Sequence, residues 1–217
     1  MVSAPAEVKP FQPAAAGAGR DAGMLIVHCP SDVMTYYDGT PQRRKAQTAP
    51  QAKASAKFQW NYFNPEREGP LEPEVEKGGC ACDTPEPCNR HTGPPYPWTR
   101  EHAAISMGSD DAVSQDGQEI YNLYIQAGIK HVIMTGVHTN ACVLGRPFGI
   151  RQLVYLGMEV VLCRDLTDPI QRMPGRHFEG LRRMVEHIER YWCPSMTSDQ
   201  VTGGKSFKFK TATDHTD

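Results

Sequence analysis

The stretch that decides the fold is His131-Val132-Ile133-Met134-Thr135-Gly136-Val137, which runs on into His138-Thr139-Asn140-Ala141-Cys142-Val143. The first seven residues are mostly apolar with little alternation, which is typical of a strand covered on both faces in a parallel sheet. The polar residues that follow predict a turn, and Cys142 falls at the first turn of the helix expected next. Residues 24–29 and 158–163 are two further strands of the same character.

Helical patterns lie between and after these strands. Apolar residues recur at helical spacing over 117–127, more loosely over 142–156, and again as a clear stripe over 177–192. Short alternation of strands and helices indicates crossover connections and a parallel sheet. We therefore expect one domain over residues 1–217 with a doubly wound, three-layer (α-β-α) fold.

Residues 38–100 do not follow this rhythm. Most of the 18 prolines lie before residue 100, and proline breaks helices and central strands. Aromatic clusters at 58–63 and 96–98 favour an ordered, Pro-rich insertion that packs on the sheet edge, covers a pocket or meets a partner subunit. Residues 201–217 are expected to form a tail.

Composition narrows the class of protein. The chain has 217 residues, 22% of them charged, and a formal net charge of -2, so it lacks the basic footprint that nucleic acid selects. No apolar run is long enough to span a membrane, and the first residues lack the apolar core of a secretory signal. Seven cysteines, an odd number, argue against a disulfide framework. We expect a soluble cytoplasmic protein that binds a small molecule and binds neither nucleic acid nor a membrane.

Cys142 is the first candidate for chemistry. Ligands of open α/β sheets bind at the carboxyl ends of the strands, and the free N–H groups of a helix N-terminus favour a thiolate and can hold an oxyanion. A nucleophilic cysteine is one interpretation of this position. A buried and inert core cysteine is the other.

The pattern G-V-x-T-N-x-C-V over residues 136–143, followed by Arg146-Pro147-Phe148-Gly149-Ile150-Arg151, resembles the isochorismatase-like cysteine hydrolases. That family includes nicotinamidases and N-carbamoylsarcosine amidohydrolases, and the resemblance runs from about residue 23 to residue 200. It implies that Cys142 attacks the carbonyl carbon of a small amide, ureido or ester substrate through a covalent intermediate. It also implies a cis peptide bond between Val137 and His138, a homo-oligomer and no cofactor. Oxyanion and substrate contacts would then come from Val137, His138, Thr139, Asn140 and Ala141.

The chain departs from this family at two catalytic positions. In the family, the catalytic Asp lies at the end of a first, central strand. No such strand pattern precedes residue 24 in this sequence. We expect either that the chain is a shortened form or that another segment, such as 206–211, takes the place of that strand. The family's Lys is missing too, because no lysine lies between Lys77 and Lys130. Asp32 and His102 remain as acid–base partners, and Arg100 as a nearby positive charge. A catalytically silent subunit that acts in binding or assembly is therefore the alternative function.

A second cluster falls within the insertion. Three cysteines and a histidine could close a tetrahedral, structural zinc site: Cys80, Cys82, Cys88 and His91. Their spacing is not one of the usual zinc motifs, so a loop without metal, or a disulfide between Cys82 and Cys88, stays open as well.

Overall fold

The computed structural model describes residues 11–69, 98–170 and 177–205. Five short parallel strands form two sheets. In the first, β1 (Val27–His28) pairs with β2 (Ala112–Val113). In the second, the order is β3 (His131–Val137), β4 (Glu159–Asp168) and β5 (Ser195–Met196).

Helices connect the strands, as crossovers between parallel strands require. Helix α1 (Phe11–Asp21) precedes β1, whereas the 3₁₀ turn η1 (Met34–Tyr37) and α2 (Pro41–Gln47) follow it. Helix α3 (Gly117–Gln126) joins β2 to β3, and α4 (Ile150–Tyr155) joins β3 to β4. Helix α5 (His177–Tyr191) leads to β5, and α6 (Asp199–Thr202) packs beside α1. The α/β fold with parallel strands is thus confirmed.

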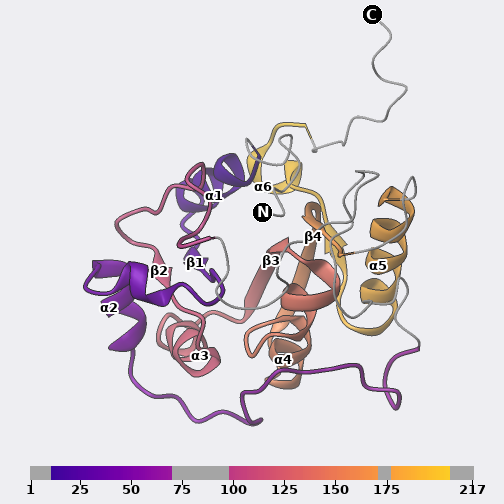
Figure 1. The fold of residues 1–217 in the computed structure, drawn as a ribbon, viewed down its shortest axis with the longest axis horizontal. Helices are drawn as coiled ribbons and strands as arrows, with labels where there is room; N and C mark the ends of the chain where they lie inside the picture. The colour runs from indigo at the N-terminus through magenta and orange to yellow at the C-terminus, as the bar shows by residue number, and fades with distance from the viewer. Residues whose placement is uncertain (1–10, 70–97, 171–176, 206–217) are drawn as a thin grey trace, which may run out of the picture.

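The two sheets do not join in the described part of the chain. There β1 is paired with β2 and β3 with β4, and Figure 1 shows β2, β1, β3 and β4 following one another across the molecule. The prediction that β3 is covered on both faces is wrong: Val132 is buried, but Ile133 and Val137 are 37% and 42% exposed. Every second residue of β3 is exposed, so within the described residues one of its faces is not covered, whereas β4 lies between β3 and β5 and is buried over most of its length.

The main core lies where α3, α4 and α5 pack against β3 and β4. Its fully buried side chains come from all three helices, from β4 and from the end of the turn after β3. They include Ile120, Leu144, Ile150, Leu153, Leu162, Met184 and Ile188. The predicted helix over 117–127 is confirmed as α3, which Asp116 caps by accepting the Glu119 N–H at 2.9 Å. The looser pattern over 142–156 yields only a short α4, because Gly145, Pro147 and Gly149 interrupt it.

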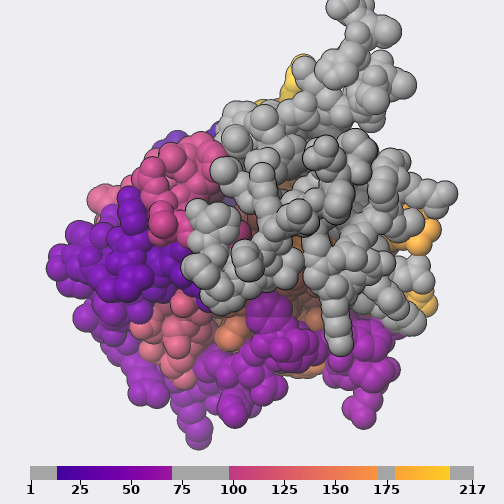
Figure 2. Space-filling view, viewed as in Figure 1, coloured from indigo at the N-terminus to yellow at the C-terminus, as the bar shows by residue number. Residues whose placement is uncertain are grey.

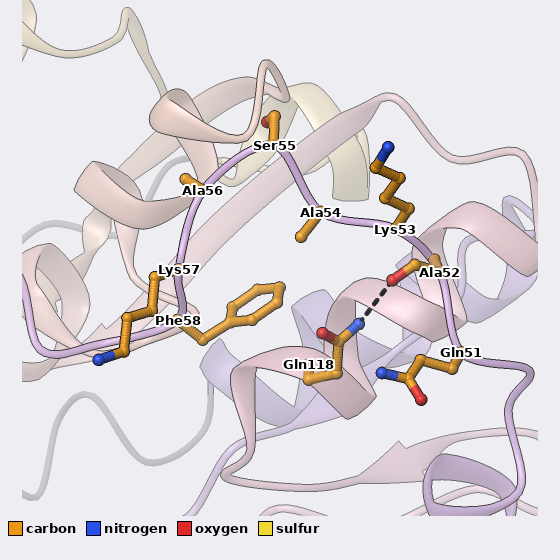
Figure 3. Close-up of a pocket in the computed structure, with 9 residues that line it drawn as sticks. All are labelled: Gln51, Ala52, Lys53, Ala54, Ser55, Ala56, Lys57, Phe58 and Gln118. Carbon is orange, nitrogen blue, oxygen red and sulfur yellow. Dashed lines mark hydrogen bonds between the residues drawn. The ribbon is translucent and has the colours of Figure 1, made fainter.

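Residues 51–64, here called the strap, are the described part of the insertion that follows α2. The strap runs extended over α3 and α4, with alternate residues turned inward, so the described insertion is ordered. It arches over a cavity of about 530 Å³ lined by residues 51–58 and Gln118. Figure 3 shows Phe58 and Gln118 turned into this space, with Gln118 Nε2 donating to Ala52 O at 3.0 Å. In the space-filling view the strap forms the lower margin of the face shown (Figure 2).

Candidate active site

The chain turns sharply where β3 ends. The peptide bond between Val137 and His138 is cis, as the resemblance implied, and Thr139–Val143 form a single π-helical turn, η2. The carbonyl oxygen of His138 accepts the N–H groups of Ala141 and Val143, both at 3.1 Å. Cys142 lies in this turn and is partly exposed. The predicted strand-to-helix corner at Cys142 is present, but the Ala141 N–H is used within the corner itself.

Two side chains fasten this turn to the end of β4. Thr139 Oγ1 lies 2.6 Å from Thr167 Oγ1, which also donates to Gly136 O at 2.8 Å. Asn140 and Ile170 form a reciprocal pair, in which Asn140 Nδ2 donates to the Ile170 carbonyl and its Oδ1 accepts the Ile170 N–H. Thr139 and Asn140 are both buried. Their side chains therefore hold the turn in place, and the oxyanion and substrate contacts that the resemblance implied for these residues stay a prediction.

Arg146 brings Cys142 and Asp32 together. Its guanidinium lies near enough to the Cys142 thiol to interact with it electrostatically, and its Nη2 donates to Asp32 Oδ2 at 3.2 Å. Burial lowers the pKa of Arg146, but the contacts with Cys142 and Asp32 outweigh it and raise the pKa above its usual value. The Arg146 guanidinium also lies over the Trp60 ring of the strap, 5.1 Å from its centroid. A permanently protonated group thus faces the thiol.

Asp32 reaches Arg146 because the chain bends just after β1. Its φ of 62° lies in the left-handed region, and its N–H donates to Gln115 Oε1 at 2.5 Å. Asp32 and Cys142 are 110 positions apart in sequence, yet both follow parallel strands, whose carboxyl ends face the same way. Asp32 is therefore brought to the site, through Arg146.

The other two predicted side chains have different neighbours. Arg100 Nη1 donates to Tyr36 Oη at 3.2 Å, and its guanidinium lies over that ring. His102 is exposed, and its Nδ1 accepts the Ala104 N–H at 3.2 Å. Within the described ranges, neither residue has a recorded interaction with Cys142.

His138 adds a neutral base to the turn. Burial lowers its pKa, and the carboxylate of Asp168 offsets only part of that effect. Asp168 ends β4 in register with Val137. Because the pKa lies below 6.5, the imidazole is uncharged at neutral pH and has one nitrogen able to accept a proton.

Comparison of the four described cysteines separates Cys142 from the rest. Burial raises the pKa of Cys29, and the nearby carboxylate of Glu101 raises it further, to about 12. Burial also raises the pKa of Cys163, and raises that of Cys193 to about 12. Cys142, by contrast, lies beside a guanidinium. Among these four cysteines, Cys142 is the one that is both partly exposed and close to the guanidinium of Arg146.

The remaining sequence predictions concern metal and membrane. Cys80, Cys82, Cys88 and His91 lie outside the described residues, so the zinc site stays a prediction. Over 11–69, 98–170 and 177–205, no three His, Cys, Asp or Glu side chains gather in a way that could hold a metal ion. No helix within those same ranges has the length and apolarity needed to cross a bilayer.

From the sequence, Arg146 was noted only within the motif that follows Cys142, and Trp60 only within the aromatic cluster at 58–63. Arg146 lies four residues after Cys142, one helical turn on, and that spacing could have signalled a contact. Trp60 reaches the site through tertiary packing, since Asn61 N donates to Gly145 O at 2.7 Å. Its place in an aromatic cluster was the only available signal.

Comparison with known proteins concerns the fold. No family model matches the sequence, and no curated protein matches it. Among solved structures, the chain is similar to a cysteine hydrolase from Pseudomonas syringae pv. phaseolicola 1448A, with a TM-score of 0.52 and 15% sequence identity. The match covers 91% of this chain and 79% of that one. The chain thus has the fold of a cysteine hydrolase, as its resemblance to the isochorismatase-like family implied.

Proposed function

We propose that this protein is a cysteine-dependent hydrolase of a small amide, ureido or ester substrate, with Cys142 as the nucleophile. The observation that carries the proposal is the position of Cys142, partly exposed in the turn after β3 and close to the guanidinium of Arg146. The shared fold with a cysteine hydrolase supports the same reaction class.

The reaction proceeds in two steps. The Cys142 thiolate attacks the carbonyl carbon, the C–N or C–O bond breaks, and the amine or alcohol leaves with a proton. Water then attacks the thioester carbonyl, releasing the acid and restoring the thiol. Arg146 stabilises the thiolate, and Asp32 orients Arg146 from its other side. His138 is our candidate to accept the thiol proton and to return it to the leaving group, because it is neutral and lies in the same turn.

A catalytically silent subunit is the second candidate function. It is favoured by the surroundings of His102, whose ring nitrogen is engaged by Ala104 N–H rather than by the thiol. In such a subunit Cys142 would be reactive towards alkylating agents yet unable to turn over a substrate. Activity and thiol reactivity must therefore be measured separately.

Thiol reactivity tests the role of Arg146. Native protein is treated with iodoacetamide at neutral pH, and labelling of each cysteine is followed by peptide mass spectrometry. We expect Cys142 to react first and Arg146→Gln to slow it by roughly tenfold, the effect of about 1.4 kcal/mol of charge stabilisation on a partly exposed thiolate. Arg182→Gln, which removes an exposed guanidinium of α5, is the matched control and should leave the rate unchanged. An equal rate in wild type and Arg146→Gln would refute the role of Arg146.

Hydrolysis tests the function itself. Wild type, Cys142→Ala and Cys29→Ala are assayed on a panel of small primary amides, N-carbamoyl amino acids and activated esters. Cys29 is a suitable control because it is also partly buried and lies at the end of β1. The proposal expects hydrolysis that Cys142→Ala abolishes and Cys29→Ala retains. Absence of hydrolysis by wild type across the panel, with Cys142 still the fastest-labelled thiol, would favour the silent subunit.

A further inference from the structure

His28, the last residue of β1, is buried between two carboxylates. It is 4% exposed; its Nδ1 lies 2.7 Å from Glu101 Oε2 and its Nε2 lies 2.9 Å from Asp111 Oδ2. A neutral imidazole has one N–H donor and one bare acceptor nitrogen, whereas an ionised carboxylate only accepts. Both ring nitrogens must therefore donate, and this geometry selects the doubly protonated, cationic ring.

The carboxylates of Asp111 and Glu101 differ in their burial and in the number of hydrogen bonds that they accept. Asp111 is 2% exposed, and it accepts from Arg20 Nε at 2.9 Å and from Gly108 N at 2.7 Å. Burial raises the pKa of Asp111, but these donors and His28 outweigh it and lower the pKa to about 2. The Glu101 side chain is 21% exposed, and His28 is the donor recorded for its carboxylate within the described ranges. When the ring loses one proton, the remaining N–H stays with Asp111 and a bare nitrogen faces Glu101.

Glu101 ties a surface segment to the end of β1. The segment, residues 98–105, leads from the insertion towards β2 and carries both Arg100 and His102. Besides the Glu101 carboxylate, its described links to this region are the Glu101 N–H, which donates to Tyr37 Oη at 2.9 Å, and Arg100, which donates to Tyr36 Oη at 3.2 Å. Tyr37 belongs to η1, which begins two residues after Asp32. The Glu101 carboxylate is thus the link of this segment that depends on the charge of His28.

We propose that residues 98–105 form a proton-controlled latch, closed when cationic His28 binds Glu101 and released when that ring loses a proton. The charged groups that face His28 are Glu101 from the segment and Asp111 from the start of β2, with Arg20 of α1 behind Asp111. The Cys29 thiol lies near Glu101 as well, and stays uncharged because its pKa is about 12. Arg100, on the segment itself, faces Tyr36 of η1.

The direction of the pH response follows from these contacts. Burial lowers the pKa of His28, but Glu101 and Asp111 outweigh it and raise the pKa above 6.5. The contribution of the latch is therefore complete below pH 6.5 and is lost as the pH rises through the higher pKa of the folded protein. A rise in pH therefore opens the latch, and a fall in pH closes it.

Hydrogen exchange of the full chain tests the latch. Protection of amides in residues 98–105, corrected for intrinsic exchange, is measured from pH 6 to pH 9 together with the His28 ring titration by NMR. We expect protection to fall roughly tenfold as His28 titrates, through local opening. In Glu101→Gln the step should vanish, because an amide accepts from the cationic ring and donates to the neutral one.

The matched control is Glu159→Gln. Glu159 forms an exposed pair with His131 at 2.8 Å, so this variant removes a histidine partner elsewhere and should keep the step. A step that persists in Glu101→Gln, or that does not coincide with the His28 titration in wild type, would overturn the proposal. If Glu101→Gln does not fold, the test is whether amide protection of residues 98–105 in wild type falls at the same pH at which the His28 ring titrates. None of these readouts depends on hydrolase activity.

Discussion

Replacement of Glu68 by Gln should destabilise the protein by about 3 kcal/mol at neutral pH. The Glu68 side chain is fully buried, bonded to Arg151 at 2.6 Å, to His187 Nε2 at 2.8 Å and to Trp192 Nε1 at 2.7 Å. It links the segment after the strap to α4 and to the end of α5. Loss of its charge leaves the Arg151 guanidinium buried without a counter-ion, which is strongly unfavourable.

The magnitude follows from the pKa of the carboxyl group. Burial raises the pKa of Glu68, but hydrogen bonds from His187 and Arg151 outweigh it and lower the pKa from 4.5 to about 2. At 1.36 kcal/mol for each pH unit, this depression corresponds to about 3 kcal/mol. Because the folded pKa is the lower one, the stabilisation is complete above pH 4.5 and is lost as the pH falls towards 2.

Urea unfolding at several pH values measures this effect. Wild type should lose about 3 kcal/mol more than Glu68→Gln between pH 5 and pH 2, because the variant has no such carboxylate to protonate. Glu66→Gln, an exposed change two residues away, is the control and should stay within about 0.5 kcal/mol of wild type. A loss below 1 kcal/mol at pH 7, or identical pH profiles for wild type and Glu68→Gln, would refute the reasoning.

Substitutions at two further positions probe the packing around the candidate site. In Gly145→Ala, the added Cβ would lie 3.0 Å from Asn61 O and 3.1 Å from Trp60 Nε1. We expect the free energy of unfolding to fall by about 1–3 kcal/mol, measured by thermal unfolding. An unchanged melting temperature would contradict this contact. Thr139→Val removes the bond to Thr167 and should cost about 1 kcal/mol, whereas Thr139→Ser should retain most of it. Equal stability of the Val and Ser variants would contradict a role for that hydroxyl.

The regular elements could be predicted because their patterns are local. The stripe of Ile120, Leu123 and Tyr124 defines α3, and the continuous apolar run over 158–163 becomes β4. Helix α2 was missed because its residues are polar, although Thr40 and Pro41 are a standard helix start. In the structure Thr40 Oγ1 does accept the Arg43 N–H.

Tertiary contacts explain what the sequence could not supply. Continuous apolarity in β3 predicted burial on both faces, but burial depends on which elements cover a strand, and the pattern contains no such information. The partners of His28 lie 73 and 83 positions away, at Glu101 and Asp111. Ion pairs at such separations have no periodicity, so only the folded chain reveals them. Arg146 was the exception, since its spacing from Cys142 is helical.

The most direct test of the central proposal is to trap the covalent intermediate. Protein is mixed with p-nitrophenyl acetate, quenched in acid within the first turnover, and digested for peptide mass spectrometry. The proposed mechanism predicts a p-nitrophenolate burst of one equivalent and an acetyl group on the Cys142 thiol that disappears as the substrate is exhausted. Ester hydrolysis with the acetyl group on another residue, or with Cys142 unmodified throughout, would contradict it.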